Sequence, residues 1–176
     1  MRKFLIIIVL FSIVSLAFGQ EQGSANDFNF GLSCLIAVSD KAAAPGPGLA
    51  AAWYNTRLFG PLGVGAHFNF VMPIVKTDFD YSNMGLAASL LAGPAYMIYD
   101  NGVFALPLTA GAHFDFVVGF GDTTTTAINL GAGAGLDFLW RFGKKWHAYA
   151  RLLAVYNFGG GGEFLAFPGL GIGFSF

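Results

Sequence analysis

The sequence predicts an all-β protein, a closed antiparallel eight-stranded up-and-down transmembrane β-barrel. In residues 103–120 every even position is apolar, while polar and small residues collect at the odd positions, and this two-residue period is typical of a strand. Segments of the same kind recur along the chain. Hydrophobic residues make up 55% of the sequence, with 25 glycines and 20 phenylalanines. Beyond residue 19, however, no apolar run approaches the ~20 residues that a membrane-spanning helix needs.

The N-terminus has the features of a secretory signal peptide. Arg2 and Lys3 form a basic head, residues 4–18 are mostly apolar, and small residues precede a cleavage site predicted after Gly19. We therefore expect residues 1–19 to be the signal peptide and residues 20–176 to form one barrel domain. Without Arg2 and Lys3 the 9 basic residues fall to 7 against 10 acidic ones, a net charge of about −3 that gives no indication of nucleic-acid binding.

The first half of the sequence contains four alternating segments, at residues 27–38, 48–56, 62–72 and 83–99. In the first segment the predicted outward residues are Phe28, Phe30, Leu32, Cys34, Ile36 and Val38. The only cysteine is thus expected on the lipid face, and no disulfide is possible. Either face of 48–56 could point outward, but a five-residue turn at 57–61 would place Leu49, Ala51, Trp53 and Asn55 inward. In 62–72, Leu62, Val64, Ala66, Phe68, Phe70 and Met72 are outward.

The second half contains four more segments, at residues 103–120, 127–142, 146–158 and 164–176. Three-residue hairpin turns are predicted at 100–102 and 143–145, each with a glycine for the left-handed position. Longer connections, at 39–47, 73–82, 121–126 and 159–163, alternate with the short ones. This asymmetry predicts external loops at one end, short periplasmic turns at the other, and both termini in the periplasm. The first and last strands must pair, because an open edge in lipid leaves backbone groups without hydrogen-bond partners.

The C-terminal segment carries the most specific resemblance. Residues 169–176 read Gly-Leu-Gly-Ile-Gly-Phe-Ser-Phe and end on Phe174 and Phe176. With this ending, the chain resembles the small outer-membrane barrels of double-membraned bacteria, of the OmpA, OmpX and OmpW type. The resemblance implies a porin-like, surface-exposed protein of a Gram-negative-type outer membrane. It also implies that the ending is an assembly signal read by the outer-membrane assembly machinery. No individual functional residue follows from it.

Several ionisable residues fall at inward positions. If the strands pair closely across the turn at 100–102, Ser89 lies opposite His113, with Asp115 two residues further on. Close pairing across the turn at 143–145 places Asp137 opposite Arg151 and Arg141 opposite His147. Ser, His and Asp within reach of one another are compatible with a nucleophilic triad. They are equally compatible with a polar network that satisfies buried groups. We expect the network, formed by Ser89, His113, Asp115, Asp137, Arg151, Arg141 and His147.

Neither a metal site nor a cofactor is expected. His67 and His113 have no obvious third inward ligand. The glycines between residues 131 and 135 do not follow the spacing of a phosphate-binding loop and are interpreted as barrel glycines.

A set of apolar inward residues is expected near the loop end, above the polar residues. It comprises Leu35, Leu49, Val71, Val117, Leu153, Val155, Leu165 and Phe167. Two interpretations remain open: ordinary core packing, or a pocket for a small hydrophobic molecule.

The sequence thus predicts a monomeric, non-enzymatic integral protein of the outer membrane with a structural or surface role. It is surrounded by outer-membrane lipid and has the capacity to bind or pass small hydrophobic molecules through the apolar upper lumen. The alternative is an adhesin-like surface module acting through the external loops at 39–47 and 73–82. The third hypothesis is a lipid-modifying enzyme.

Overall fold

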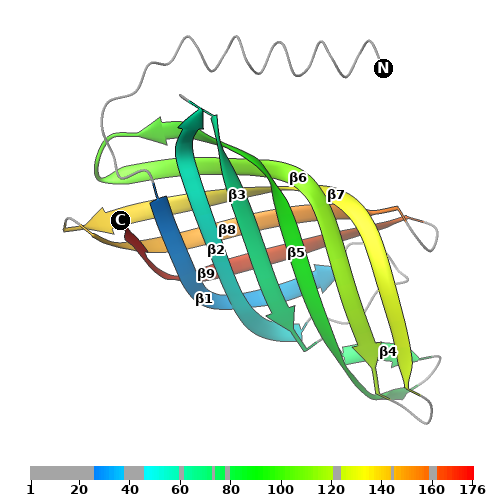
Figure 1. Ribbon diagram of the computed structural model, residues 1–176. Coiled ribbons are helices and arrows are strands. Elements are labelled where there is room, and N and C mark those ends of the chain that lie inside the picture. The colour runs from blue at the N-terminus through cyan, green and yellow to red at the C-terminus, as the bar shows by residue number, and fades with distance from the viewer. Residues whose placement is uncertain are drawn as a thin grey trace, which may run out of the picture.

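The computed structural model describes residues 26–37, 46–59, 62–72, 74–77, 80–120, 124–143, 145–158 and 162–176 (Figure 1). The predicted signal peptide and its cleavage site lie outside these residues, as do most of the 39–47 loop and positions 78–79, on which the adhesin hypothesis depends. The long strands are β1 (Asn26–Ala37), β2 (Gly46–Phe59), β3 (Leu62–Val71), β5 (Asp80–Asp100), β6 (Phe104–Gly119), β7 (Thr125–Phe142), β8 (Trp146–Asn157) and β9 (Glu163–Ser175). A short strand, β4 (Ile74–Thr77), pairs with the start of β5.

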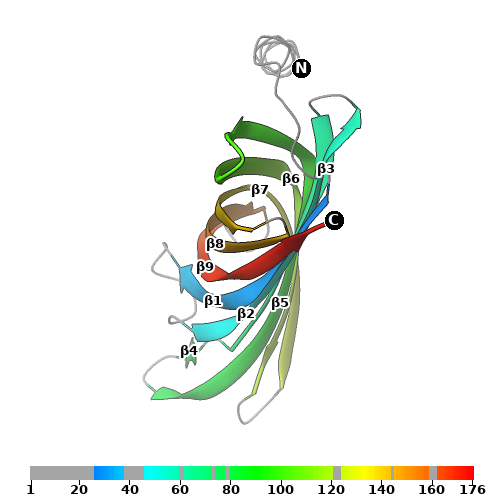
Figure 2. The ribbon, with the colours of Figure 1, turned by 90° about the vertical axis from the view of Figure 1, so that its left-hand side faces the viewer.

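The eight long strands form a closed antiparallel barrel, as predicted. Each long strand pairs with its neighbour in sequence, with β3 followed by β5 around the barrel, and β1 pairs with β9 to complete the circle. Phe28 lies opposite Phe174 in this closing pair and Leu32 lies opposite Leu170. The strands run obliquely around the barrel (Figure 2). We call the end with the β2–β3, β5–β6 and β7–β8 connections the turn end, and the opposite end the loop end.

Side chains alternate between the exterior and the lumen along each strand. In β6, Phe104, Phe114 and Phe116 are exposed, whereas His113 and Asp115 are buried. The neighbouring residues Leu152 and Leu153 of β8 are 54% and 0% exposed, respectively. Large apolar groups cover the outside, and polar groups lie inside, which is the arrangement required by a barrel in hydrocarbon. The described part of the chain has no helix long and apolar enough to span a membrane.

Tight hairpin turns lie near both expected positions, but the first closes with Asp100 opposite Ala105 instead of Tyr99 opposite Val103. Gly102 and Gly143 have φ angles of 83° and 82°, a left-handed conformation that glycine adopts without steric cost. At the first turn, Asn101 Oδ1 accepts hydrogen bonds from the backbone N–H groups of Val103 and Phe104. Asp100 Oδ1 accepts one from Gly102.

The sequence left either face of the strand at residues 48–56 open, and the structure has the orientation opposite to the one that a five-residue turn would give. Leu49 and Trp53 are exposed, by 46% and 36%, while Ala50, Ala52 and Tyr54 are buried. Asn55 pairs with Val64, so Trp53 lies opposite the outward Ala66. The pairing of β2 with β3 is irregular between Asn55 and Phe59, and β2 extends to Phe59 instead of ending at a five-residue turn. The irregularity changes which residues are opposite one another, and a shift of one residue reverses the faces of a strand.

Two further predictions about the β3–β6 region were wrong. Residues 73–82 were expected to be a loop, but β4 and the start of β5 form a hairpin extension there, with Ile74 opposite Met84. The register between β5 and β6 also differs from the prediction. Ser89 lies opposite Asp115, and His113 lies opposite Leu91. The register already differs at the hairpin, where Tyr99 pairs with Leu106 instead of Val103, and the irregularity between Met97 and Tyr99 shifts it back by one residue.

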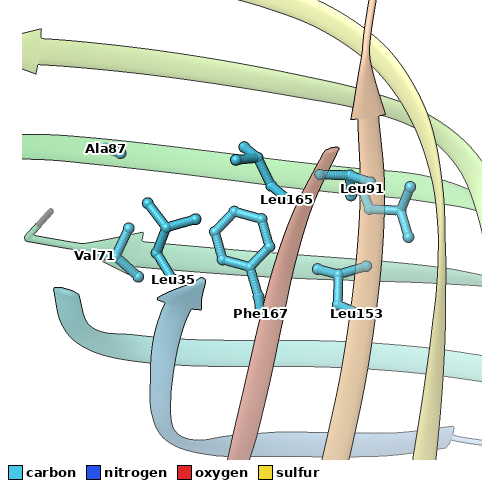
Figure 3. Close-up of a cluster of buried hydrophobic side chains, with 8 residues drawn as sticks. Leu35, Val71, Ala87, Leu91, Leu153, Leu165 and Phe167 are labelled. Atoms are coloured by element: carbon cyan, nitrogen blue, oxygen red, sulfur yellow. The ribbon is translucent and has the colours of Figure 1, made fainter. Parts of the chain in front are cut away.

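Apolar side chains in the lumen form three clusters. The largest lies in the loop-end half, and Figure 3 shows its leucine and valine side chains gathered around Phe167. A second contains Met97, Ala105, Leu139 and Tyr149, near the turn end. The third contains Ala52, Tyr54 and Ala95. Side chains from many strands therefore occupy the lumen along its length, as expected for an eight-stranded barrel.

Candidate functional site in the barrel lumen

A buried ion pair occupies the turn-end half of the lumen. Asp137 of β7 and Arg151 of β8 are cross-strand partners, as the sequence predicted. Arg151 Nε donates to Asp137 Oδ1 at 2.8 Å and its NH2 group donates to Oδ2 at 3.0 Å. Both side chains are fully buried, so the two-pronged contact compensates charges that water cannot reach.

Two residues that the sequence analysis missed complete the surroundings of Asp137. Tyr54 from β2 donates its hydroxyl hydrogen to Oδ2, and Asn29 Nδ2 from β1 donates to the same oxygen at 3.0 Å. The carboxylate thus accepts four hydrogen bonds from three strands. Tyr54 was missed because β2 was assigned the wrong face, and Asn29 because cross-lumen contacts do not follow from hairpin register.

The network continues from Asn29 toward the turn end. His147 Nε2 lies 2.5 Å from Asn29 Oδ1, and its Nδ1 lies 3.5 Å from Ser175 Oγ. Ser175 donates in turn to Asp27. Because Asn29 donates to Asp137 through its nitrogen, its oxygen must accept, which assigns a proton to His147 Nε2. We call the set Asp27, Asn29, Tyr54, Asp137, His147, Arg151 and Ser175 the turn-half network.

Arg141 lies at the edge of this network. It is the cross-strand partner of His147, as predicted, but its hydrogen bond goes to Asp100 on β5. Arg141 NH1 donates to Asp100 Oδ1 at 2.6 Å, and NH2 lies 4.0 Å from Asp27 Oδ2. These charges come from β1, β5 and β7 and surround the lumen near the turn end.

A second polar network surrounds His113. Its Nε2 lies 2.8 Å from Ser89 Oγ and 3.1 Å from Asp115 Oδ1, and its Nδ1 lies 2.9 Å from Asn157 Oδ1. Asn157 Nδ2 donates to Asp115 Oδ2 at 2.7 Å. We call these four residues the loop-half network. The sequence predicted Ser89, His113 and Asp115, whereas Asn157 was missed because it belongs to a strand that does not adjoin β6.

The contacts of His113 differ from those of a Ser–His–Asp triad. In such a triad the serine and the carboxylate bind opposite nitrogens of the imidazole, and the carboxylate fixes the tautomer. Here Ser89 and Asp115 approach the same nitrogen, and an amide occupies the other side. All four side chains are buried within the lumen. The geometry is that of a network satisfying buried polar groups.

The loop-half network lies beside the largest apolar cluster, which corrects the expected order along the lumen. Asn157 pairs with Glu163 at the loop end of β8 and β9, and the His113 and Phe167 ring centroids are 6.5 Å apart. Ser89, His113 and Asp115 are therefore not below the apolar residues, toward the middle and turn end, as predicted. Strand tilt brings residues from different positions along neighbouring strands to one level.

Most of the predicted apolar set is brought together. Leu35, Val71, Leu153, Val155, Leu165 and Phe167 belong to the largest cluster, and Val117 packs against it. Leu49 faces outward instead, because of the β2 register. Ala87 and Leu91 of β5 are additional members that the sequence analysis did not include.

Glycines on one wall accommodate large side chains from other strands. A Cβ atom added at Gly135 would lie 2.7 Å from His67 Cε1, and one at Gly31 would lie 2.7 Å from the Tyr149 hydroxyl. A Cβ at Gly173 would meet both Asn29 Oδ1 and His147 Nε2. Within the described residues there is no group of three or more His, Cys, Asp or Glu side chains arranged to hold a metal ion.

Comparisons with known proteins agree with this geometry. Neither a family model nor a curated protein matches the sequence. Among solved structures, the chain is similar to Neisserial surface protein A, with a TM-score of 0.68 and 13% identity over 89% of this chain and 100% of that one. It is also similar to Ail, the attachment invasion locus protein of Yersinia pestis, with a TM-score of 0.60 and 15% identity over 89% and 100%.

A further similar structure is the outer-membrane protein OprG from Pseudomonas aeruginosa, with a TM-score of 0.61 and 10% identity over 90% of this chain and 99% of that one. The chain has the fold of these small outer-membrane barrels. The resemblance seen in the sequence is therefore confirmed at the level of fold. Together with the apolar exterior, it identifies a transmembrane β-barrel of the outer-membrane type.

Proposed function

We propose that the protein is a monomeric, non-enzymatic barrel of the outer membrane whose lumen is closed to ions and whose role is structural or surface-related. Its partners are outer-membrane lipid and, during insertion, the outer-membrane assembly machinery. Similarity to Neisserial surface protein A, Ail and OprG supports the location. The signal peptide predicted from the sequence supports export.

The closure of the lumen by the turn-half network carries this proposal. Asp137 joins side chains of β1, β2 and β8 to β7, and therefore connects strands on different sides of the barrel. Tyr54 is fully buried, and Arg151 also lies 3.4 Å from the backbone oxygen of Ala51 on β2. Side chains that span the lumen in this way leave no continuous water path for a hydrated ion.

Planar-bilayer recording of the purified, refolded chain tests the closure. The wild-type protein is expected to show no stable conductance steps. A variant with Tyr54→Ala and Arg151→Ala removes the two largest side chains around Asp137 and should produce measurable conductance. The matched control is Leu152→Ala, which shortens the adjacent lipid-facing residue and should stay silent. Large, stable conductance of the wild-type barrel would contradict the proposal.

A second candidate function is binding of a small hydrophobic molecule at the loop end. The observation that favours it is the apolar cluster around Phe167, to which β1, β3, β5, β8 and β9 all contribute. A fluorescent fatty acid such as parinaric acid is a suitable probe. Leu153→Trp fills the cluster and should abolish binding, whereas the outward Leu152→Trp should not. If the wild-type barrel does not bind the probe, the cluster is ordinary core packing.

A further inference from the structure

Three fully buried polar residues of the lumen have no hydrogen-bond partner in the described part of the chain. They are His67 and Asn69 of β3 and Thr109 of β6, all 0% exposed. The hydroxyl groups of Ser33 on β1 and Tyr149 on β8 are also buried without a partner. Both ring nitrogens of His67, both polar atoms of the Asn69 amide and the hydroxyl of Thr109 are without partners in the described structure. A buried group left in this state costs ~1–3 kcal/mol.

Other histidine and asparagine residues of the lumen are fully paired. His113 and His147 have partners on both ring nitrogens, and Asn29 and Asn157 have partners on both polar atoms. The same residue types are thus satisfied elsewhere in the barrel. Five unpartnered atoms on His67, Asn69 and Thr109 indicate a group that the protein itself does not supply.

The position of these residues follows from the register. Gly65 precedes His67 on the inner face of β3, and Gly111 follows Thr109 on the inner face of β6. Gly65 pairs with Gly93, Gly93 adjoins Gly111, and Gly111 pairs with Gly133. We call these four residues the glycine row. His67 and Thr109 lie diagonally on either side of it.

The glycine row contributes no side chain to the lumen. The three heavy atoms nearest to a Cβ added at Gly93 or Gly111 are backbone atoms of the neighbouring strand, not side chains reaching across the barrel. At Gly65 the Thr109 and Tyr54 side chains already lie over the wall, and at Gly133 the Val155 side chain does. Backbone alone therefore forms the wall only at Gly93 and Gly111, next to Thr109. A polar site of this kind suits water, which needs two to four hydrogen-bonding partners.

We propose that His67, Asn69 and Thr109 bind a small cluster of internal water molecules beside the glycine row. The three side chains offer donors and acceptors but no carboxylate and no fixed positive charge, so neither a metal cation nor an anion is favoured. Water can donate to one residue and accept from the next, which satisfies all five atoms. The proposal concerns hydration and is independent of ion conduction.

The site lies between the two polar networks. The Tyr54 ring, which belongs to the turn-half network, packs edge-on against His67 with centroids 5.3 Å apart. Ser89, which belongs to the loop-half network, is the cross-strand partner of Asn69. Water bound at this site thus lies between networks that share no direct hydrogen bond among those described, and it hydrates a lumen that remains closed to ions.

Nuclear magnetic resonance of the full chain refolded in lipid nanodiscs tests this proposal. Magnetisation transfer from water to the Asn69 side-chain amide should give cross-peaks with the sign of a long-lived bound water. The amides of Asn29 and Asn157 are matched controls, because each already donates to a carboxylate, and they should give none. Absence of the Asn69 cross-peak, or equal cross-peaks at all three amides, would overturn the proposal.

A double variant tests whether the three residues act together. His67→Leu with Thr109→Val leaves Asn69 in place but removes two of the three groups that hold the water. The Asn69 cross-peak should then be lost, while the dispersed backbone amide spectrum of the folded barrel is retained. A cross-peak that persists unchanged would show that water reaches Asn69 without the other two residues, which would overturn the three-residue site. If the double variant does not fold, Thr109→Val alone should weaken the cross-peak, and an unchanged peak would again contradict the site.

Discussion

Replacing Asp137 with alanine removes the centre of the turn-half network. Asp137 accepts two hydrogen bonds from Arg151, one from Asn29 and one from Tyr54. Without it, the Arg151 cation remains buried and loses its counter-charge. Breaking a buried ion pair in this way costs ~3–5 kcal/mol. We expect a loss of about 4 kcal/mol in the free energy of unfolding, a large part of the ~5–15 kcal/mol typical of folded proteins.

Reversible urea unfolding in lipid vesicles, followed by tryptophan fluorescence, measures this loss. The control is the triple variant Asp137→Leu, Arg151→Met and Tyr54→Phe, which removes the charges and the hydroxyl but keeps the lumen filled. It should recover most of the lost stability, because replacing a whole buried ion pair by apolar groups is often close to neutral. A cost below about 1 kcal/mol for Asp137→Ala would refute the reasoning. So would a triple variant as unstable as the single one.

Three other predictions follow from burial, glycine packing and orientation. Leu91→Ala opens a cavity in the largest apolar cluster and should lower the free energy of unfolding by ~2–5 kcal/mol in the same assay. The lipid-facing Leu90→Ala should lower it clearly less. Equal losses for the two variants would contradict the assignment of faces. Gly173→Val forces a side chain against Asn29 and His147 and should lower the free energy of unfolding by ~1–3 kcal/mol. The outward control Ile172→Val should lower it by less than about 1.5 kcal/mol. A Gly173→Val barrel as stable as the wild type would show that the contact is not tight. Orientation is tested with variants that keep a single lysine in the mature chain and a membrane-impermeant amine reagent added to intact cells. The reagent should label Lys76 beside the loop end and should not label Lys145 at the turn end. Labelling of Lys145 but not Lys76 would show that the predicted orientation is inverted.

Strand periodicity and tight turns predicted much of the fold from the sequence. The β7–β8 register was correct, including the Asp137–Arg151 and Arg141–His147 pairs, because the turn at 143–145 is short and no irregularity follows it. The β5–β6 register was wrong because the hairpin closes with Asp100 opposite Ala105 instead of Tyr99 opposite Val103, and because an irregularity follows between Met97 and Tyr99. Neither the position of the turn nor the irregularity has a distinct sequence signal here, and together they move Ser89 from opposite His113 to opposite Asp115.

The face of β2 could not be predicted because apolar residues occupy both of its faces. Tyr54 has an apolar ring and a hydroxyl, so it suits either lipid or a polar lumen; only its hydrogen bond to Asp137 decides the question. Asn29, Asp100 and Asn157 were missed for a different reason. Their partners lie on strands that are not adjacent to their own, and such contacts depend on strand tilt and on the way the barrel closes.

Site-directed spin labelling tests most directly whether alternate residues face lipid and lumen. In a Cys34→Ser background, single cysteines at positions 150, 152 and 154 of β8 should carry nitroxides with high accessibility to oxygen dissolved in the bilayer. Labels at positions 151, 153 and 155 should show low accessibility to oxygen. A two-residue period in collision rate is the predicted result. Uniform accessibility along the strand, or a period with the opposite phase, would contradict the barrel described here.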